Sequence, residues 1–120
     1  MMSEQQLDAI KNEKKSLTKK QEDLYQRQRT CERLTDGIGS YFRRNQRLMQ
    51  KTRELFRKND DSRVFDEVYA LFTQDSGQTM MALGDEKRTL KRQQHLLEEQ
   101  KQALVKEEKK LDSREESDEH

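Results

Sequence analysis

Apolar residues recur every seven positions through both halves of this chain, and a second series lies three or four positions from the first. A repeat of about 3.5 residues sustained over many heptads is the pattern of a coiled coil and not of a strand. The residues of this predicted helix-helix seam are Ile10, Leu17, Leu24, Cys31, Ile38, Phe42, Phe56, Phe65, Tyr69, Phe72, Leu83, Leu90, Leu97, Leu104 and Leu111.

Composition supports long helices. The chain has no proline, only 29% of its residues are apolar, and 41% are charged. Its outer parts consist largely of Gln, Glu, Lys, Arg and Leu, which all favour helices. A narrow apolar seam suits this composition better than a globular core does.

The two halves of the repeat match when the chain folds back at its centre. Leu24 then meets Leu97, and Cys31 meets Leu90. The mirror point lies in the polar stretch 58–62, whose Asn, Asp and Ser residues suit a turn and a helix cap. This symmetry predicts a chain reversal near residue 60.

We therefore predict an all-α fold, a long antiparallel two-helix hairpin that resembles a coiled coil and that partner helices can complete into a bundle. The C-terminal residues contain no apolar side chain, so we expect them to form a disordered acidic tail. The predicted bounds are 1–112 for the hairpin, with helix 1 at about 3–57, a loop at about 58–62 and helix 2 at about 63–112, and 113–120 for the tail.

A second turn signal lies at Gly37 and Gly39. Under the fold-back, these two residues face Gly84 and Ala82. Small residues opposite one another favour a close helix contact or a kink at this point. A chain reversal at Gly37 and Gly39 is the alternative that the sequence leaves open.

Toward the termini, the second series of the repeat becomes polar. A half-polar seam is weaker than an apolar one, so we expect the terminal arms to fray in the isolated chain while the aromatic region 38–83 persists. The polar positions are Lys14, Gln21, Gln28, Gln94, Lys101 and Glu108.

Several apolar residues fall off the seam, where a two-helix hairpin does not enclose them. They are Leu34, Leu48, Leu55, Val64, Val68, Leu71 and Met81. Such residues are either scattered over the surface or form a second stripe for a partner helix. We favour the stripe, because exposed apolar patches with polar rims mark binding sites and lone hairpins are marginally stable. The predicted partner-binding residues are Leu48, Leu55, Val68 and Leu71, with Arg44 and Arg47 to steer an acidic partner.

The two halves of the chain differ in net charge. Residues 1–60 carry 15 Lys and Arg against 9 Asp and Glu, whereas residues 61–120 carry 10 against 15. This difference favours the antiparallel pairing of the halves. The basic cluster at 43–58 also permits a nucleic-acid role, which the near-neutral whole chain makes the least favoured hypothesis.

Residues for catalysis are sparse. Cys31 is the single cysteine, and His95 and His120 lie outside any metal-ligand or triad spacing. We therefore expect no enzyme activity, no catalytic residue, no metal or cofactor and no small-molecule substrate. The sequence lacks an apolar run that would span a bilayer and a signal-peptide core, so we expect a cytoplasmic protein without membrane insertion.

The layout resembles a known family. Its features are the opening Ser3-Glu-Gln-Gln-Leu-Asp-x-Ile10, a long polar first helix, aromatic residues around a central loop, and a Glu/Lys/Gln-rich second helix. Across essentially the whole chain, these features resemble the small LXG-associated α-helical (Lap-type) targeting proteins of Gram-positive type VIIb secretion loci. The chain departs from the similarly shaped WXG hairpins, because it has no Trp.

This resemblance implies a non-enzymatic adaptor that binds the N-terminal LXG domain of a toxin, in some cases with a second small helical protein, and promotes toxin export. The adaptor could be exported together with the toxin without a cleavable signal peptide, and the isolated chain could form a homodimer; the sequence decides neither point. The alternative function, for which the heptads alone suffice, is a coiled-coil scaffold or stalk protein of another machine.

Overall fold

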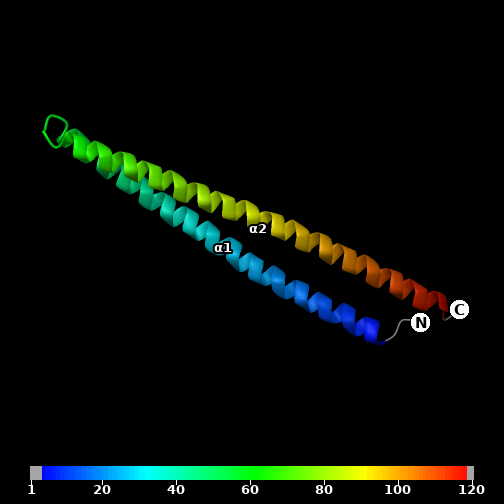
Figure 1. The fold of residues 1–120 in the computed structure, drawn as a ribbon. Helices are drawn as coiled ribbons and strands as arrows, with labels where there is room; N and C mark the ends of the chain where they lie inside the picture. The colour runs from blue at the N-terminus through cyan, green and yellow to red at the C-terminus, as the bar shows by residue number, and fades with distance from the viewer. Residues whose placement is uncertain (1–3, 119–120) are drawn as a thin grey trace. The chain divides into compact units, whose positions relative to one another are not determined.

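The structure is a computed structural model that describes residues 4–118, with side chains described for residues 4–114. Two helices account for nearly all of it: α1 (Glu4–Leu55) and α2 (Ser62–Asp118). Figure 1 shows the chain reversing between them, and the described residues form no strand. The predicted all-α fold with two long helices is confirmed. No helix in the described part of the chain is long and apolar enough to cross a membrane.

The helix bounds differ slightly from the predicted ones. The turn occupies residues 56–61, and α1 ends two residues before the predicted position. Residues 113–118, which the sequence assigns to a disordered tail, belong to α2, because Glu and Arg sustain a helix where no Gly or Pro interrupts it. The remaining tail residues and Ser3, the predicted start of helix 1, lie outside the described residues.

Backbone hydrogen bonds explain where the chain turns. The N–H of Phe56 still donates to the carbonyl of Thr52, at 3.1 Å. From there the bonds tighten to a three-residue spacing, with the N–H of Asn59 donating to the Phe56 carbonyl at 3.0 Å. The Asn59 side-chain oxygen then accepts from the N–H of Asp61 at 3.2 Å. These contacts reverse the chain next to the predicted mirror point, and α2 begins at Ser62.

The helices pair in two compact units, which we describe separately. The arm unit consists of residues 1–28 and 89–120, and the loop unit of residues 29–88. In each unit, a segment of α1 runs antiparallel to a segment of α2 (Figure 1).

The arm unit holds most of the buried apolar side chains. Of the six that are buried among the described residues, five lie here: Ile10, Leu17, Leu24, Leu90 and Leu104. Ile10, Leu17 and Leu104 form one cluster, against which Leu97 and Leu111 pack. The predicted fold-back register brings these same residues together, so the structure confirms it in the arm unit.

Three polar pairs complete the arm unit between the leucines, and we call them the polar ladder. Lys14 forms an ion pair with Glu108, the Lys101 ammonium donates to the Gln21 side-chain oxygen at 3.4 Å, and the Gln28 amide donates to the Gln94 amide oxygen at 2.9 Å. The aliphatic stems of these long side chains cover the leucines while their polar ends pair. Burial is therefore greatest in the arm unit, not in the aromatic region that the sequence favours.

Both glycines of the second turn signal are helical and lie inside α1. The alternative of a chain reversal there is thus wrong. Gly39 is buried, and a Cβ at this position would lie 3.7 Å from the terminal methyl group of Met80. This is an ordinary contact with the end of a long side chain, so it does not show the close helix contact predicted for this region. A Cβ at Gly37 would meet nothing within 4 Å, and one at Gly84 would meet only Arg88, so the predicted contact between these two glycines is absent.

Replacing Gly37 with Ala should stabilise the protein by about 0.5–1 kcal/mol, because Gly in a helix interior costs this much relative to Ala. The new methyl group enters open space. Urea unfolding followed by circular dichroism would measure the change. Gly39→Ala is the matched comparison: its Cβ would be in ordinary van der Waals contact with the Arg43 guanidinium at 3.5 Å and with the Met80 methyl group at 3.7 Å, so we expect a gain of at least similar size. Destabilisation by Gly37→Ala would contradict a regular helix at this position.

Candidate partner-binding face

Aromatic contacts join the two helices of the loop unit. The rings of Phe56 and Phe65 stack with centroids 4.6 Å apart, next to the turn. The rings of Phe42 and Phe72 meet edge to face at 5.7 Å. All four residues belong to the predicted seam, so the structure places the seam of the loop unit between the helices as expected. Offset-stacked and edge-to-face geometries are the favourable ones for aromatic pairs.

Polar seam residues of the loop unit bond within their own helices. The Asn45 amide donates to the Tyr41 carbonyl at 2.8 Å, and the Ser76 hydroxyl donates to the Phe72 carbonyl at 2.7 Å. Thr52 bonds the Leu48 carbonyl in the same way, at 2.9 Å. These bonds satisfy the polar groups locally. The aromatic rings, rather than polar bonds, therefore dominate the seam of the loop unit.

One side of the loop unit carries directed polar contacts between the helices, and we call it the polar side. The Arg53 guanidinium donates to Asp66 at 2.8 Å and lies 4.5 Å from the centre of the Tyr69 ring. The side-chain amides of Gln46 and Gln50 donate to the Tyr69 hydroxyl at 3.3 Å and 3.2 Å. These contacts fix which flank of each helix lies on this side.

The heptad positions then define the opposite side. With Phe42 and Phe56 assigned to position a of α1, Arg53 lies at position e; with Phe65 assigned to position d of α2, Asp66 also lies at position e. In an antiparallel pair, residues at position e face one another on one side of the seam, and residues at position g do so on the other. Residues at position g, together with the adjacent position c, therefore form the side away from the polar contacts.

Seven large apolar residues lie on that opposite side, and we call them the apolar face. Four are spaced every seven residues along α1 at position g, and three lie at positions g and c of α2. Their side chains range from 47% to 82% exposed. The members are Leu34, Tyr41, Leu48, Leu55, Val64, Val68 and Leu71. One side of a two-helix unit thus presents a row of large apolar side chains to solvent, which is unusual for a helix pair without a partner.

The four predicted apolar binding residues, Leu48, Leu55, Val68 and Leu71, all belong to this face. Their binding role stays a prediction. Arg44 lies at position c of α1 and borders the face, whereas Arg47 lies at position f, away from it. Met81, grouped with the others in the sequence, is 68% exposed but lies at position f of α2, outside the face. Tyr41 is a member of the face that was not predicted, although its sevenfold spacing from Leu34 and Leu48 is the sequence signal for it.

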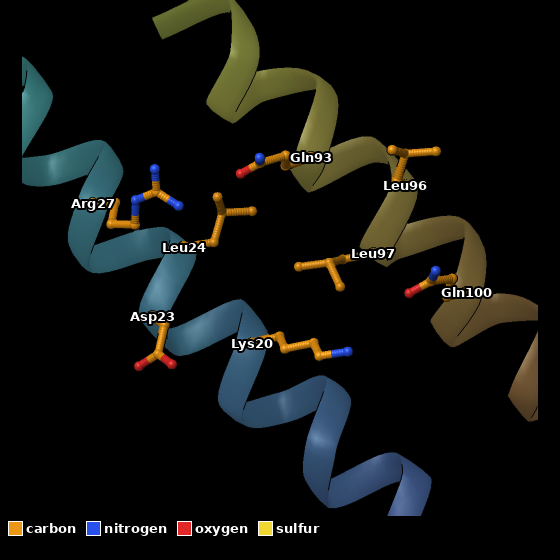
Figure 2. Close-up of a pocket in the computed structure, with 8 residues that line it drawn as sticks. All are labelled: Lys20, Asp23, Leu24, Arg27, Gln93, Leu96, Leu97 and Gln100. Carbon is orange, nitrogen blue, oxygen red and sulfur yellow. The ribbon is translucent and has the colours of Figure 1, made fainter. Parts of the chain in front are cut away.

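The arm unit has a smaller groove between its helices. Figure 2 shows Leu24 on α1 and Leu97 on α2 pointing toward one another, with Lys20, Arg27, Gln93 and Gln100 around them. Leu96 points away from the groove and is 57% exposed. Because Leu24 is itself buried, this groove is part of the helix contact and offers little apolar surface to a partner.

A family model matches residues 5–111 of the chain. The chain belongs to the DUF3958 family, described as proteins of unknown function. The match includes the turn, nearly all of α1 and most of α2. No curated protein and no solved structure matches the chain.

Cys31 of this DUF3958 protein belongs to the loop unit, and His95 belongs to the arm unit. Cys31 is buried, and its thiol lies 3.8 Å from the Leu83 carbonyl oxygen. The side chain of His95 is 65% exposed and lies 3.8 Å from Glu98, its neighbour on the next turn of α2. Within the described residues, no three side chains of His, Cys, Asp or Glu are grouped to hold a metal ion.

Hydrogen bonds on the polar side change the acidity of Tyr69. The amides of Gln46 and then Gln50 lower the pKa of Tyr69 from its ordinary value of 10.0, because they donate to the phenol oxygen and stabilise the phenolate. A pKa that is lower in the folded than in the unfolded state adds stability above pH 10. This contribution is lost as the pH falls through the lowered pKa.

An ultraviolet absorbance titration of the folded protein should therefore show one phenol that ionises below the ordinary tyrosine value. Tyr69→Phe should remove this ionisation. Replacing Gln46 and Gln50 together with Leu should move it back toward the ordinary value, because the phenolate loses both donors. If the Tyr69→Phe variant kept the part of the absorbance titration that lies below the ordinary tyrosine pKa, the hydrogen bonds to Tyr69 would not persist in solution.

Proposed function

We propose that this DUF3958 protein is a non-enzymatic helical adaptor that binds the N-terminal LXG domain of a toxin and promotes its export by a type VIIb secretion system. The observation that carries the proposal is the apolar face, an exposed apolar side on an otherwise charged helix pair. Amphipathic helices bind such faces through residues spaced three and four apart. The resemblance to LXG-associated targeting proteins supplies the identity of the partner, which acts together with the adaptor in the cytoplasm.

The exposure of its leucine side chains supports a binding role for the apolar face. The side chains of Leu48, Leu55 and Leu71 are 62%, 82% and 61% exposed, although each is a large apolar group. Removing apolar surface from water contributes about 25 cal/mol per Å². One or two helices of an LXG domain, with or without a second small helical protein, would complete a bundle on this side.

Charge supports an acidic partner. Arg44 borders the apolar face directly, and Lys51 occupies the same position one heptad further along α1. Basic groups at the rim of an apolar patch raise the rate of association with an acidic partner and select against a basic one. Reversing Arg44 to Glu should therefore slow association more at low salt than at high salt. Arg47→Glu is the matched control, because Arg47 lies away from the face.

Co-expression tests the proposal. An affinity-tagged LXG domain encoded beside this gene should co-purify with the chain, and deletion of this gene should reduce the amount of toxin in the culture medium. Complementation with the wild-type gene is the control for the deletion. If no LXG domain binds and export is unchanged, the chain is not an adaptor for toxin export, and a scaffold role fits the fold better.

A further inference from the structure

The helices of the loop unit carry opposite charge. Residues 29–58 contain nine Lys and Arg against three Asp and Glu, whereas residues 59–88 contain three against seven. Both segments also contribute large residues to the apolar face. The loop unit is therefore self-complementary, because a basic apolar helix and an acidic apolar helix lie side by side on one surface.

Side-chain contacts between the helices of the loop unit indicate which residues of α1 and α2 lie at about the same level. Gly39 of α1 lies beside Met80 of α2, and Arg53 lies beside Asp66. Counting along both helices from either pair places Leu48 about level with Leu71, and Arg44 about level with Asp75. The alignments given by the ring contacts of Phe56 with Phe65 and of Phe42 with Phe72 lie on either side of this one. The apolar face thus has an apolar pair at one level and a pair of opposite charges one turn away.

We propose that a second copy of this chain covers the apolar face, so that two loop units form a four-helix bundle with both turns at the same end. A two-fold axis parallel to the helices keeps every residue at its own level and places α1 of one copy over α2 of the other. Leu48 of each copy then lies over the partner's Leu71, and Arg44 lies near the partner's Asp75. Every neighbouring helix in such a bundle is antiparallel, which is the stable up-down arrangement.

The other face-to-face arrangement has its two-fold axis perpendicular to the helices. It places α1 over α1, so that the basic segment 29–58 of one copy lies against the same segment of the other. Like charges at such an interface oppose association. The charge distribution therefore favours the arrangement with both turns at the same end over this one.

Size also suits a dimer. Specific interfaces bury about 800 Å² on each partner, contributed by roughly 20–30 residues. The seven residues of the apolar face are exposed along residues 34–55 and 64–71, and a dimer of that size would bury their polar borders as well. Their burial also supplies the core that a single pair of helices lacks.

This inference does not rest on the proposed function, because it needs only the chain itself. It adds a consequence to that function. A toxin domain and a second copy would occupy the same face, so the adaptor would exchange its own copy for the toxin and keep the apolar face covered in both states.

Sedimentation equilibrium of the full chain, over a range of concentrations, tests the dimer. We expect a reversible monomer–dimer equilibrium. Arg44→Glu should weaken it about tenfold, since two symmetry-related attractive contacts become repulsive. Adding Asp75→Arg to that variant should restore the dimer, because the opposite charges then face each other with reversed signs. A chain that stays monomeric at every concentration would overturn the proposal.

Cysteine trapping tests the arrangement of the copies. In a Cys31→Ser background, chains with Leu48→Cys are mixed with chains with Leu71→Cys and oxidised. The proposed bundle predicts mainly mixed disulfides between the two kinds of chain, because Leu48 lies over the partner's Leu71. A dominant product of two Leu48→Cys chains, or of two Leu71→Cys chains, would show another arrangement and overturn the proposed one.

Discussion

Aspartate at both Leu48 and Leu71 should abolish partner binding and leave the chain helical. Both side chains are more than half exposed in the structure, so their replacement removes little from the contact between α1 and α2. A toxin domain that covers the apolar face would instead have to bury two unpaired carboxylates, and a second copy of the variant would have to bury four with its own pair, at several kcal/mol. Co-purification of the LXG domain and sedimentation of the isolated chain would both measure the effect.

A matched control separates loss of the face from a general effect of added charge. Met81→Asp introduces the same carboxylate at an exposed apolar residue of α2, but outside the apolar face. This variant should bind like the wild type. Normal binding by the double variant would place the partner elsewhere on the chain. Loss of helical circular dichroism would show that Leu48 and Leu71 support the helix pair itself.

Leu104→Ala should reduce the free energy of unfolding by about 2–5 kcal/mol, the range for truncating a buried leucine. Leu104 is 4% exposed and packs in one cluster with Ile10 and Leu17, so its removal leaves a cavity that the neighbours fill only in part. Urea unfolding at a fixed protein concentration, followed by circular dichroism, would measure the change. For a chain with so few buried residues, a loss of this size is a large part of the total stability.

Leu96→Ala is the control for this variant, because Leu96 lies nearby on α2 but is 57% exposed. We expect it to change the free energy of unfolding by less than about 0.5 kcal/mol. Equal effects of the two substitutions would contradict the burial that the structure assigns to the arm unit.

The sequence predicts the fold of this protein well for a physical reason. An apolar residue every seven positions has few ways to be buried, and the matching series in the two halves leave the central turn as the natural point of reversal. The leucine cluster of the arm unit confirms that register. The glycine pair at 37 and 39 is a weaker signal, because a helix tolerates Gly when neighbouring turns are well formed.

The candidate face is harder to predict, because exposure depends on which flank of each helix the partner helix leaves open. The sequence separates Leu48, Leu55, Val68 and Leu71 from the seam, but it groups Met81 with them. The contacts of Arg53 with Asp66 and of Gln46 and Gln50 with Tyr69 show which flanks are shared, and they depend on side-chain geometry. The polar pairs of the arm unit are equally hard to predict, since the sequence places Lys14 and Glu108 in the seam but does not reveal that their side chains pair.

The polar ladder of the arm unit has a consequence for the uniqueness of the fold. If α1 slid along α2 by one heptad, Ile10 would still meet a leucine, as would Leu17, so the apolar series alone does not distinguish the two alignments. The slid alignment, however, would bring Lys14 opposite Lys101 and leave Glu108 without its lysine. Repulsion between like charges and the loss of paired polar groups disfavour that alignment. The residues that weaken the arms in a simple count of apolar contacts are therefore those that give the chain one alignment instead of several.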